Sequence, residues 1–300
     1  MLTIGSRGSQ LALCQARWVQ GRLEALGAPC CIEIIKTTGD KITDVPLAGV
    51  GTKGLFTKEI EEALLEGRID LAVHSLKDLP TQLPLGLTLA AIPEREDPRD
   101  VLVGRRLAEL GAGARVGTSS LRRQAQLRAV RPDLKVVPVR GNLDTRLRKL
   151  AQGHYEALVL AAAGLKRLGW EERITEFLPV ETMCPAVGQG ALAVETRQDG
   201  SEAQRTCGQL DDAPSRAAVL AERAVLAALG GGCQVPIGAH ARVENDQLRL
   251  LAVVVSPDGS RIVRRQAIGS LAEALKLGEA LAQELLATGA QEILEAVYGI

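Results

Sequence analysis

The fold of this chain is decided by one stretch, Val116-Gly-Thr-Ser-Ser-Leu-Arg-Arg-Gln-Ala-Gln-Leu127. It begins as a short strand, passes through a small polar turn, and becomes a helix with a hydroxyl residue as its N-cap. Free backbone N–H groups at such a helix start, with hydroxyls beside them, suit an anion. Arg122 and Arg123 fall in the first helical turn, where cations oppose the helix dipole, so a negative group between them is expected. A solvated helix start is the alternative.

The same order of strand and helix recurs on both sides of this stretch. Before it, the sequence predicts a helix capped by Ser9 and an apolar strand that ends at His74. Alternating strands and helices form parallel sheets covered on both faces, in which ligands bind beyond the carboxyl ends of the strands. Further strands are expected at 2–4, 32–35, 87–92, 101–103, 135–139 and 157–160, and helices at 57–66, 142–151 and 162–168. On the first of these helices, Glu61, Glu62 and Glu66 should face solvent.

The last third of the chain has a different pattern. A helix at 215–229 precedes three expected strands at 237–243, 247–255 and 261–268. The joints between the strands carry Asn, Asp, Gly and Pro, which form tight turns, so this sheet should be antiparallel. A long amphipathic helix at 271–287 completes a small domain. The fold class is therefore α/β, followed by a C-terminal α+β domain.

Composition narrows the class of protein. The chain has 300 residues, 46% of them hydrophobic and 24% charged, which fits two or three globular domains and excludes a disordered chain. Its 36 Lys and Arg balance 36 Asp and Glu, which argues against a dedicated nucleic-acid binder. From Arg115 to Lys149, however, eight Arg and two Lys face only Asp133 and Asp144, a local net charge of +8. Arginine pairs with planar carboxylates and phosphates, so a polyanionic ligand is expected.

Cysteine, histidine and hydropathy exclude other classes. The six cysteines contain no C-x-x-C pair and the three histidines are scattered, so no metal site is expected. The first residues carry no secretion signal, and no apolar run approaches the about 18 residues of a membrane span. We therefore expect a cytoplasmic protein with free thiols and no membrane partner.

Three polar clusters could carry chemistry. His74-Ser-Leu-Lys-Asp78 places a hydroxyl, an ammonium and a carboxylate at the end of a strand. Such an aspartate can move protons or stabilise a cation, or it can be a turn residue before a proline. Arg140 follows a strand and Arg146 lies on the next helix, with few local acids to pair them. Gly230-Gly-Gly-Cys-Gln-Val-Pro-Ile-Gly238 places Cys233 in a glycine-rich loop, as an attachment point, a nucleophile or a buried thiol.

Together these motifs resemble the hydroxymethylbilane synthase family, also called the porphobilinogen deaminases. Eight long motifs follow that family's order over essentially the whole chain. Small departures are Thr52, where glycine is expected, and Leu76, where methionine is frequent. The matching motifs are Ile4-Gly-Ser-Arg-Gly-Ser-Gln-Leu-Ala-Leu13, Gly51-Thr-Lys-Gly-Leu-Phe-Thr-Lys-Glu59, His74-Ser-Leu-Lys-Asp78, Gly117-Thr-Ser-Ser-Leu-Arg-Arg-Gln-Ala-Gln126, Val139-Arg-Gly-Asn-Leu-Asp-Thr-Arg-Leu147, Ala161-Ala-Ala-Gly-Leu-Lys-Arg167, Pro185-Ala-Val-Gly-Gln-Gly190 and Gly231-Gly-Cys-Gln-Val-Pro-Ile-Gly238.

The resemblance implies a fold and an activity. The family has three domains, the first two being doubly wound lobes that resemble bilobal solute-binding proteins. The boundaries expected here are 1–91 with 191–208, 92–190, and 213–300. The family condenses four porphobilinogen molecules head to tail with release of ammonia, and then hydrolyses off the linear tetrapyrrole hydroxymethylbilane. A dipyrromethane cofactor stays attached by a thioether to a loop cysteine, which matches Cys233. The family suggests a monomer.

The resemblance also implies roles for residues. The family's catalytic aspartate matches Asp78, which would protonate the leaving amine, stabilise the cationic azafulvene and assist loss of the α-proton, with Lys77 beside it. Each pyrrole ring carries an acetate and a propionate, which accounts for the arginines. Phe56, on a glycine-rich segment long enough for a lid, would cover the cofactor or the growing chain. Cofactor contacts are expected from Cys233, Lys53, Ser75, Asp78, Thr118, Ser120, Arg122, Arg123 and Arg146. Substrate contacts are expected from Arg7, Ser9, Arg140, Arg146 and Arg167.

Two other functions fit parts of the pattern. A non-catalytic bilobal binding protein for a carboxylate-rich ligand would need only the first two domains, and it leaves the Cys233 loop unexplained. An RNA-binding module could use the arginine-rich stretch, but aromatic residues make up 2% of the chain and offer few stacking platforms. We therefore expect porphobilinogen as the small-molecule partner and no nucleic acid.

Overall fold

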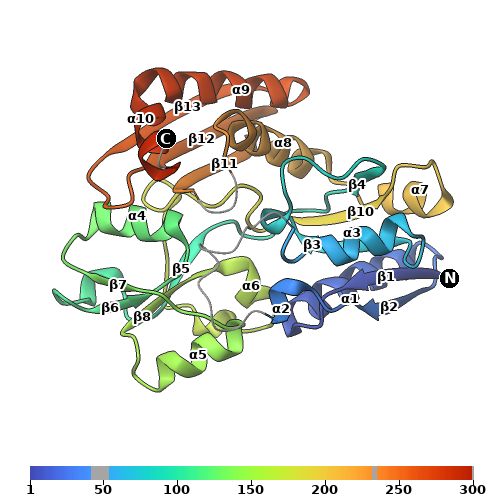
Figure 1. The fold of residues 1–300 in the computed structure, drawn as a ribbon, viewed down its shortest axis with the longest axis horizontal. Coiled ribbons are helices and arrows are strands. Elements are labelled where there is room, and N and C mark those ends of the chain that lie inside the picture. The colour runs from blue at the N-terminus through green and yellow to red at the C-terminus, as the bar shows by residue number, and fades with distance from the viewer. Residues whose placement is uncertain (42–53, 232–234, 299–300) are drawn as a thin grey trace. The chain divides into compact units, whose positions relative to one another are not determined.

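The structure is a computed structural model that describes residues 1–41, 54–231 and 235–298 (Figure 1). Its contacts divide the chain into two compact units. One joins Met1–Glu96 to Ala191–Arg216, and the other joins Asp97–Gly190 to Ala217–Ile300. The second unit contains two separate sheets. This division into two units does not test the boundaries of the three expected domains, which stay a prediction.

The first unit is built on a five-stranded mixed sheet. In spatial order its strands are β2 (Cys30–Ile34), β1 (Leu2–Ser6), β3 (Leu71–Ser75), β10 (Leu192–Arg197) and β4 (Leu87–Ala91). Strands β2, β1 and β3 run parallel, as predicted. β10 runs antiparallel to both β3 and β4, so the expectation of wholly parallel sheets is wrong here. The chain returns to this unit after Gly190, and no crossover helix forces the returning strand to run parallel to its neighbours.

Helices pack on both faces of this sheet. The long helix α1 (Gln10–Ala25) contacts one face and α3 (Lys58–Leu65) the other. The Ser9 hydroxyl accepts a hydrogen bond from the backbone N of Ala12, which confirms the predicted N-cap. Glu61 is buried on the face of α3 that carries Leu64, so the expectation that it faces solvent is wrong. The shorter helices are α2 (Thr38–Lys41), the single turn η2 (Leu76–Asp78) and α7 (Glu202–Gly208), which was not expected.

The second unit begins with a similar mixed sheet. In spatial order its strands are β7 (Lys135–Val137), β6 (Arg115–Gly117), β8 (Ala157–Ala161), β5 (Asp100–Gly104) and β9 (Glu176–Phe177). β7, β6 and β8 are parallel, whereas β5 runs antiparallel to β8 and β9. Helices α4 (Leu121–Val130), α5 (Leu143–Ala151) and α6 (Ala162–Arg167) follow β6, β7 and β8 in turn, which confirms the predicted alternation. Short turns η3 (Leu107–Glu109) and η4 (Glu171–Arg173) complete this part.

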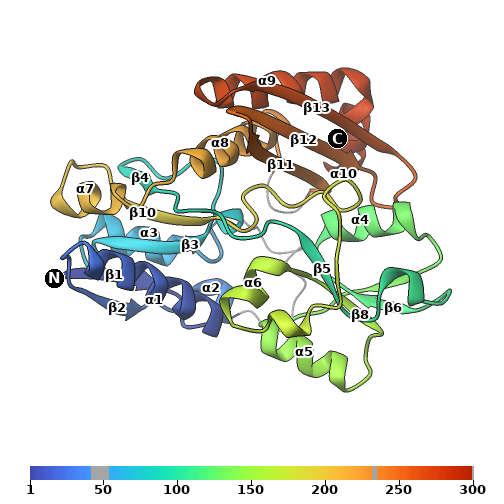
Figure 2. The ribbon, with the colours of Figure 1, turned by 180° about the vertical axis from the view of Figure 1, so that it is seen from behind.

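A three-stranded antiparallel sheet follows in the same unit (Figure 2). Its strands β11 (Ile237–Glu244), β12 (Gln247–Val255) and β13 (Ile262–Ser270) pair in sequence order, as predicted. Asn245 and Asp246 have φ of 49° and 58°, which suits a two-residue type I′ turn. The apolar core of this sheet includes helices α8 (Ala213–Ala228), α9 (Ala274–Leu285) and α10 (Gln291–Tyr298). The helix expected at 271–287 forms over most of its length as α9, and the first residues of η6 (Leu286–Ala290) extend it. The helical backbone breaks just beyond it, at Gly289 with φ of 105°, and α10 was not predicted.

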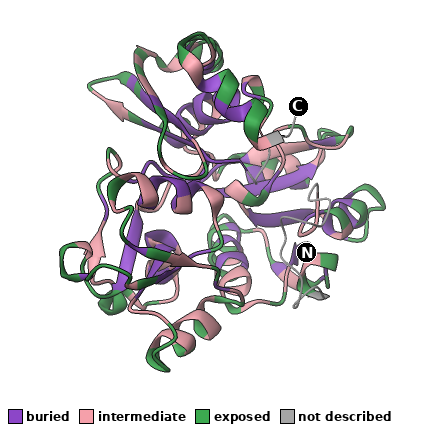
Figure 3. Cartoon of the chain, turned by 60° about the vertical axis from the view of Figure 1, so that its left-hand side comes forward, coloured by how far each residue is buried: buried purple, intermediate pink, exposed green. Residues whose placement is uncertain are grey.

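Burial follows the sheets (Figure 3). Many strand residues are buried, whereas the outer faces of helices and the connecting loops are exposed. Within the residues that the structure describes, no helix is both long and apolar enough to cross a membrane. Polar side chains are seldom buried, and burial is costly unless they have a partner. The polar side chains inside this core are therefore candidates for function.

Candidate active site

The predicted catalytic segment lies at the end of β3. Ser75 is the last residue of that strand, and the turn η2 follows it directly. Leu76 is fully buried and anchors the turn, while Lys77 is half-buried and Asp78 is exposed. The hydroxyl of Ser75 is hydrogen-bonded to the side-chain amide of Gln15 on α1, at 2.9 and 3.2 Å. Asp78 is therefore carried on an anchored turn at the carboxyl edge of the parallel strands.

Arg7 follows β1 at the same edge of the sheet. Its guanidinium group bonds to Asp40 at 2.5 Å and lies over the ring of Phe56, 4.2 Å from the centroid. Burial by itself would raise the pKa of Asp40, but hydrogen bonds from Arg7 and Thr37 outweigh it and hold that pKa below its usual value. Sequence reasoning missed Asp40, because nothing local distinguishes it from any other acidic residue of a short helix. Phe56, predicted as a lid, thus contacts a predicted substrate-binding residue.

In the second unit, Arg122 and Arg123 are buried at the start of α4 and share one carboxylate. Arg122 donates to Asp100 at 2.6 Å, and Arg123 donates to it at 2.7 and 2.9 Å. Asp100 is fully buried in β5, outside the stretch Arg115–Lys149. The protein itself therefore supplies the negative group that was expected between these two arginines.

This Asp100 cluster keeps a surplus of positive charge. Burial would raise the pKa of Asp100, but the charges of Arg122 and Arg123 hold it far below its usual value, so the carboxyl is ionised. Gln189 also donates to Asp100, at 2.8 Å. Two arginines against one carboxylate leave one positive charge, and Nε of Arg122 is buried without a hydrogen-bond partner. A ligand that carries carboxylates fits such a site, because it would neutralise the surplus.

Three hydroxyl residues shape the start of α4. Ser120 accepts a hydrogen bond from the backbone N of Arg123, and Thr118 accepts one from the backbone N of Ser120. Ser119 bonds to both the backbone N and the carbonyl O of Val139, at 3.0 and 2.8 Å. The predicted helix cap is confirmed, whereas the cofactor contacts of Thr118 and Ser120 stay predictions.

Three more of the predicted arginines lie nearer the surface. Arg140, Arg146 and Arg167 are all half-buried. Arg146 donates to the carbonyl O of Gly141 at 2.8 Å, and Arg167 donates to that of Gly190 at 2.7 Å. Gly141 has φ of 105°, a conformation that favours glycine, so the turn before α5 depends on it. These backbone contacts orient the guanidinium groups of Arg146 and Arg167.

The predicted site residues divide between the two units. The first unit holds Arg7, Ser9, Phe56, Ser75, Lys77 and Asp78, and the second holds Thr118, Ser120, Arg122, Arg123, Arg140, Arg146 and Arg167. Most of them follow the carboxyl ends of parallel strands, where ligands bind in open α/β sheets. Lys53 and the predicted anchor Cys233 lie outside the described residues, as does most of the segment expected to form a lid.

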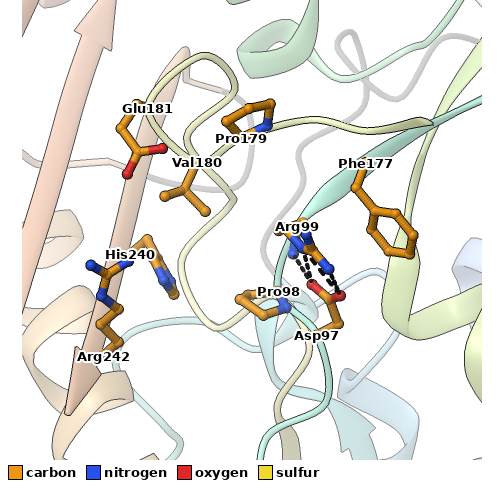
Figure 4. Close-up of a pocket in the computed structure, with 9 residues that line it drawn as sticks. All are labelled: Asp97, Pro98, Arg99, Phe177, Pro179, Val180, Glu181, His240 and Arg242. Carbon is orange, nitrogen blue, oxygen red and sulfur yellow. Dashed lines mark hydrogen bonds and ion pairs between the residues drawn. The ribbon is translucent and has the colours of Figure 1, made fainter. Parts of the chain in front are cut away.

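A cavity of about 490 Å³ in the second unit is lined by other residues (Figure 4). Arg99 on one side pairs with Asp97 at 2.7 Å and lies over the ring of Phe177, 4.2 Å from its centroid. Arg242 on the other side pairs with Glu244 at 2.9 Å. Arg99 is thus neutralised by Asp97, whereas Arg242 shares Glu244 with Arg249. The lining includes none of the predicted site residues.

In the described part of the chain, no three His, Cys, Asp or Glu side chains are grouped so that they could hold a metal ion. The five described cysteines form no disulfide. Burial raises the pKa of Cys184 and of Cys207 to about 12, so both stay protonated and unreactive.

Known proteins and family models match this chain over nearly its whole length. Residues 2–205 match the family model "Porphobilinogen deaminase, dipyromethane cofactor binding domain", and residues 216–287 match "Porphobilinogen deaminase, C-terminal domain". The chain is 54% identical over 301 aligned residues to the porphobilinogen deaminase of Geobacter metallireducens, covering 99% of this chain and 95% of that one. It is 55% identical over 298 residues to that of Roseiflexus castenholzii, covering 98% of each. Among solved structures, the methionine-binding protein MetQ matches with a TM-score of 0.45 and 13% identity, over 70% of this chain and 89% of that one.

Proposed function

The chain belongs to the porphobilinogen deaminase family, and we propose that its residues divide the reaction into two tasks. It is a transferase of tetrapyrrole biosynthesis with a dipyrromethane cofactor. One task is proton transfer and stabilisation of positive charge, which we assign to Asp78. The other is to hold the carboxylates of substrate and product, which we assign to the arginines.

Asp78 is the proposed catalytic residue. In its protonated form it would deliver a proton to the leaving amine of porphobilinogen. As a carboxylate it would then stabilise the cation that remains when ammonia departs, by accepting a hydrogen bond from the pyrrole N–H, and would assist loss of the α-proton after coupling. Lys77 beside it would stabilise the carboxylate form. Gln15, through Ser75, and the buried Leu76 would keep the turn in place.

The half-buried arginines are the proposed substrate clamps. Arg7, Arg140, Arg146 and Arg167 would pair with the acetate and propionate of each pyrrole unit, because a guanidinium group binds a carboxylate through two parallel hydrogen bonds. Each pyrrole ring brings two negative charges, so a growing chain of rings needs several arginine clamps rather than one. Ser9 would assist at the start of α1.

A substrate carboxylate that binds Arg7 would change the ion pair between Arg7 and Asp40. Arg7 is already bonded to Asp40, so the substrate would have to replace that carboxylate or share the guanidinium group with it. Phe56 lies against the same group and would cover the bound ring as the predicted lid.

The surplus charge of the Asp100 cluster supports the cofactor assignment. When bound, the dipyrromethane would supply a covalently anchored primer with two carboxylates on each ring. Arg122, Arg123 and Arg146, with Thr118 and Ser120, would hold those carboxylates in the second unit. The remaining proposed contacts are Ser75 and Asp78 in the first unit, Lys53, and Cys233 as the thioether anchor.

One observation carries this proposal. Arg122 and Arg123 are buried with a single counter-charge, in a segment that matches the cofactor-binding family model. Burying an uncompensated positive charge costs several kcal/mol, on the order of 3–5, so a bound anion that removes it is expected.

Intact mass tests the proposal. The purified protein should exceed its sequence mass by two linked pyrrole units, and Cys233→Ser should remove both the excess and the activity. Cys31→Ser, which replaces a free and half-buried thiol of β2, is the matched control and should change neither. A fully active protein of unmodified mass would contradict the cofactor assignment. A protein that binds porphobilinogen but releases no ammonia would instead indicate the alternative, a carboxylate-binding protein.

We also propose that the enzyme acts as a monomer in the cytoplasm. The five described cysteines form no disulfide with one another, which suits a reducing compartment. A thioether anchor suits it too, because reduction does not cleave a carbon–sulfur bond. Size-exclusion chromatography with light scattering should give the mass of a single chain, and a stable dimer would contradict the proposal.

A further inference from the structure

Three titratable side chains are buried together next to the catalytic segment of the first unit. Glu61 belongs to α3, His74 to β3 and Glu195 to β10. In the antiparallel pairing of β3 with β10, Glu195 is opposite Ala72, two residues before His74. Ala72 packs in the core that contains α3, and side chains two apart in a strand share a face. All three titratable groups therefore lie between the sheet and α3.

The contacts of these groups leave two oxygens without a donor. Nε2 of His74 lies 3.0 Å from Oε2 of Glu195, and these side chains are 4% and 0% exposed. The other oxygen of Glu195 and Oε1 of Glu61 are also buried, and neither has a hydrogen-bond partner. The hydroxyl of Thr57 is also buried without a partner and can donate to one of these oxygens. The other acceptor would still be costly, unless one of the carboxyl groups carries a proton and becomes a donor.

The surrounding charges favour that proton on Glu61. Burial raises the pKa of Glu61, and the charge of Glu195 raises it further, whereas Thr57 and His74 lower it by less. Glu62, the next residue of α3, adds a smaller upward shift to the pKa.

Arg197, another charged residue near α3, is engaged elsewhere. Arg197 of β10 donates to the carbonyl oxygens of Leu64 and Ile69, at the C-terminal end of α3, at 2.7 and 2.8 Å. Its nearest acids are Asp70 and Asp199. Arg197 therefore holds the end of α3 and contributes no hydrogen bond to Glu61 or Glu195.

We propose that Glu61 keeps a proton in the folded protein at neutral pH, and that Glu61, Glu195 and His74 act together as positioning residues for Asp78. The neutral carboxyl of Glu61 donates to Glu195, and Glu195 fixes His74. His74 directly precedes Ser75 and the turn that carries Asp78. Loss of the proton would bury a second carboxylate against Glu195 and push α3 away from β3 and β10. Only the catalytic consequence rests on the proposed role of Asp78.

Infrared spectroscopy of the holoenzyme tests for the proton directly. A neutral carboxylic acid has a C=O stretching band that carboxylates lack, and at about pH 7 ordinary Asp and Glu, with pKa near about 4, are ionised. The wild type should show such a band and Glu61→Gln should lose it. Glu62→Gln is the matched control, because Glu62 is exposed and adjacent on the same helix, and it should keep the band. A wild type without the band, or a Glu61→Gln variant that retains it, would overturn the proposal.

A second variant covers the case in which Glu61→Gln does not fold. Glu195→Gln removes the charge that repels ionised Glu61, so Glu61 should lose its proton at a lower pH. In a pH titration the infrared band should then disappear earlier than in the wild type. A band that disappears at the wild-type pH would show that the two carboxyl groups do not interact.

The pH profile of kcat tests the positioning role. Gln has nearly the shape of a protonated Glu, so Glu61→Gln should keep kcat at pH 7 within about two-fold of the wild type. It should also keep that activity at higher pH, where the wild type declines as Glu61 ionises, while Glu62→Gln should follow the wild type. Coincident profiles of Glu61→Gln and wild type at every pH would overturn the positioning role. The infrared band needs no turnover, so normal turnover of Asp78→Asn would refute the role of Asp78 and leave the proton on Glu61 unaffected.

Discussion

The two units bury charge in opposite ways. In the second unit, Asp100 lies between two arginines and stays ionised, so the cluster keeps a positive charge. In the first unit, two carboxyl groups are buried with one histidine, which pairs with Glu195, and a proton on Glu61 can complete the cluster from within. A proton is available in any aqueous solution, whereas a counter-anion of the right shape is not. Buried charge therefore indicates a ligand site most strongly where protonation cannot remove it, as at an arginine pair.

The largest effect is expected from breaking the positive cluster. Asp100→Asn would leave two buried guanidinium groups without a counter-charge, which should lower the free energy of unfolding by about 3–5 kcal/mol. Unfolding in urea measures the loss. The control is Asp133→Asn, which removes the exposed partner of Arg131 and should leave the free energy of unfolding close to that of the wild type. Equal and small losses in the two variants would mean that Asp100 does not neutralise the arginines.

The pH dependence of unfolding sharpens the comparison. The Asp100 cluster should lose its stabilising effect as the pH falls, and the Glu61 cluster should lose it as the pH rises. The folded-state pKa of Asp100 lies below its unfolded value, so its stabilisation is present above the unfolded pKa and is lost as the pH falls through the folded one. The folded-state pKa of Glu61 lies above its unfolded value, so its contribution is complete below the unfolded pKa and is lost as the pH rises through the folded one.

Urea unfolding at a series of pH values measures both limbs. Asp100→Asn should flatten the acid limb alone, and Glu61→Gln should flatten the limb in which stability falls as pH rises. If one variant flattened both limbs of the curve, or if neither variant flattened the limb assigned to it, the two clusters would not bury charge in opposite ways.

The smallest effect on stability is expected for Arg140→Ala. Arg140 is half-buried, and its loss should change the free energy of unfolding by no more than about 0.5 kcal/mol. Removing a clamp should nevertheless stall elongation, so that intact mass shows extra pyrrole units still attached to the protein. Arg148→Ala, at an exposed position of α5, is the control and should not stall. Normal product release by Arg140→Ala would show that Arg140 is not a clamp.

Local elements were more predictable than sheet pairing. The N-caps Ser9 and Ser120, the tight turn at Asn245 and the strand Gln247–Val255 agree with the structure, because each depends on neighbours within a few residues. The antiparallel directions of β5 and β10 depend on partners far away in the chain, so periodicity did not reveal them. Helix α7 was missed because only Ala203 and Cys207 of its seven residues are buried.

Charge was the least predictable feature of the site. A count of charges within Arg115–Lys149 showed the surplus of arginine but did not include Asp100. Asp100 lies in β5, outside that stretch, and contacts the arginines of α4 only in the folded protein. Glu61 was assigned to the solvent face by its charge, although its spacing to Leu64 places it on the buried face. A buried acid interrupts the hydrophobic pattern, so pattern analysis alone does not find it.

The most direct test of the account is the turnover of Asp78→Asn. Asp78 is exposed, so the variant should unfold in urea like the wild type. Its kcat for release of ammonia from porphobilinogen should fall by at least about 100-fold, because a general acid of this kind contributes about 10² to 10⁴. A correctly folded Asp78→Asn protein that turns over porphobilinogen at the wild-type rate would contradict the account.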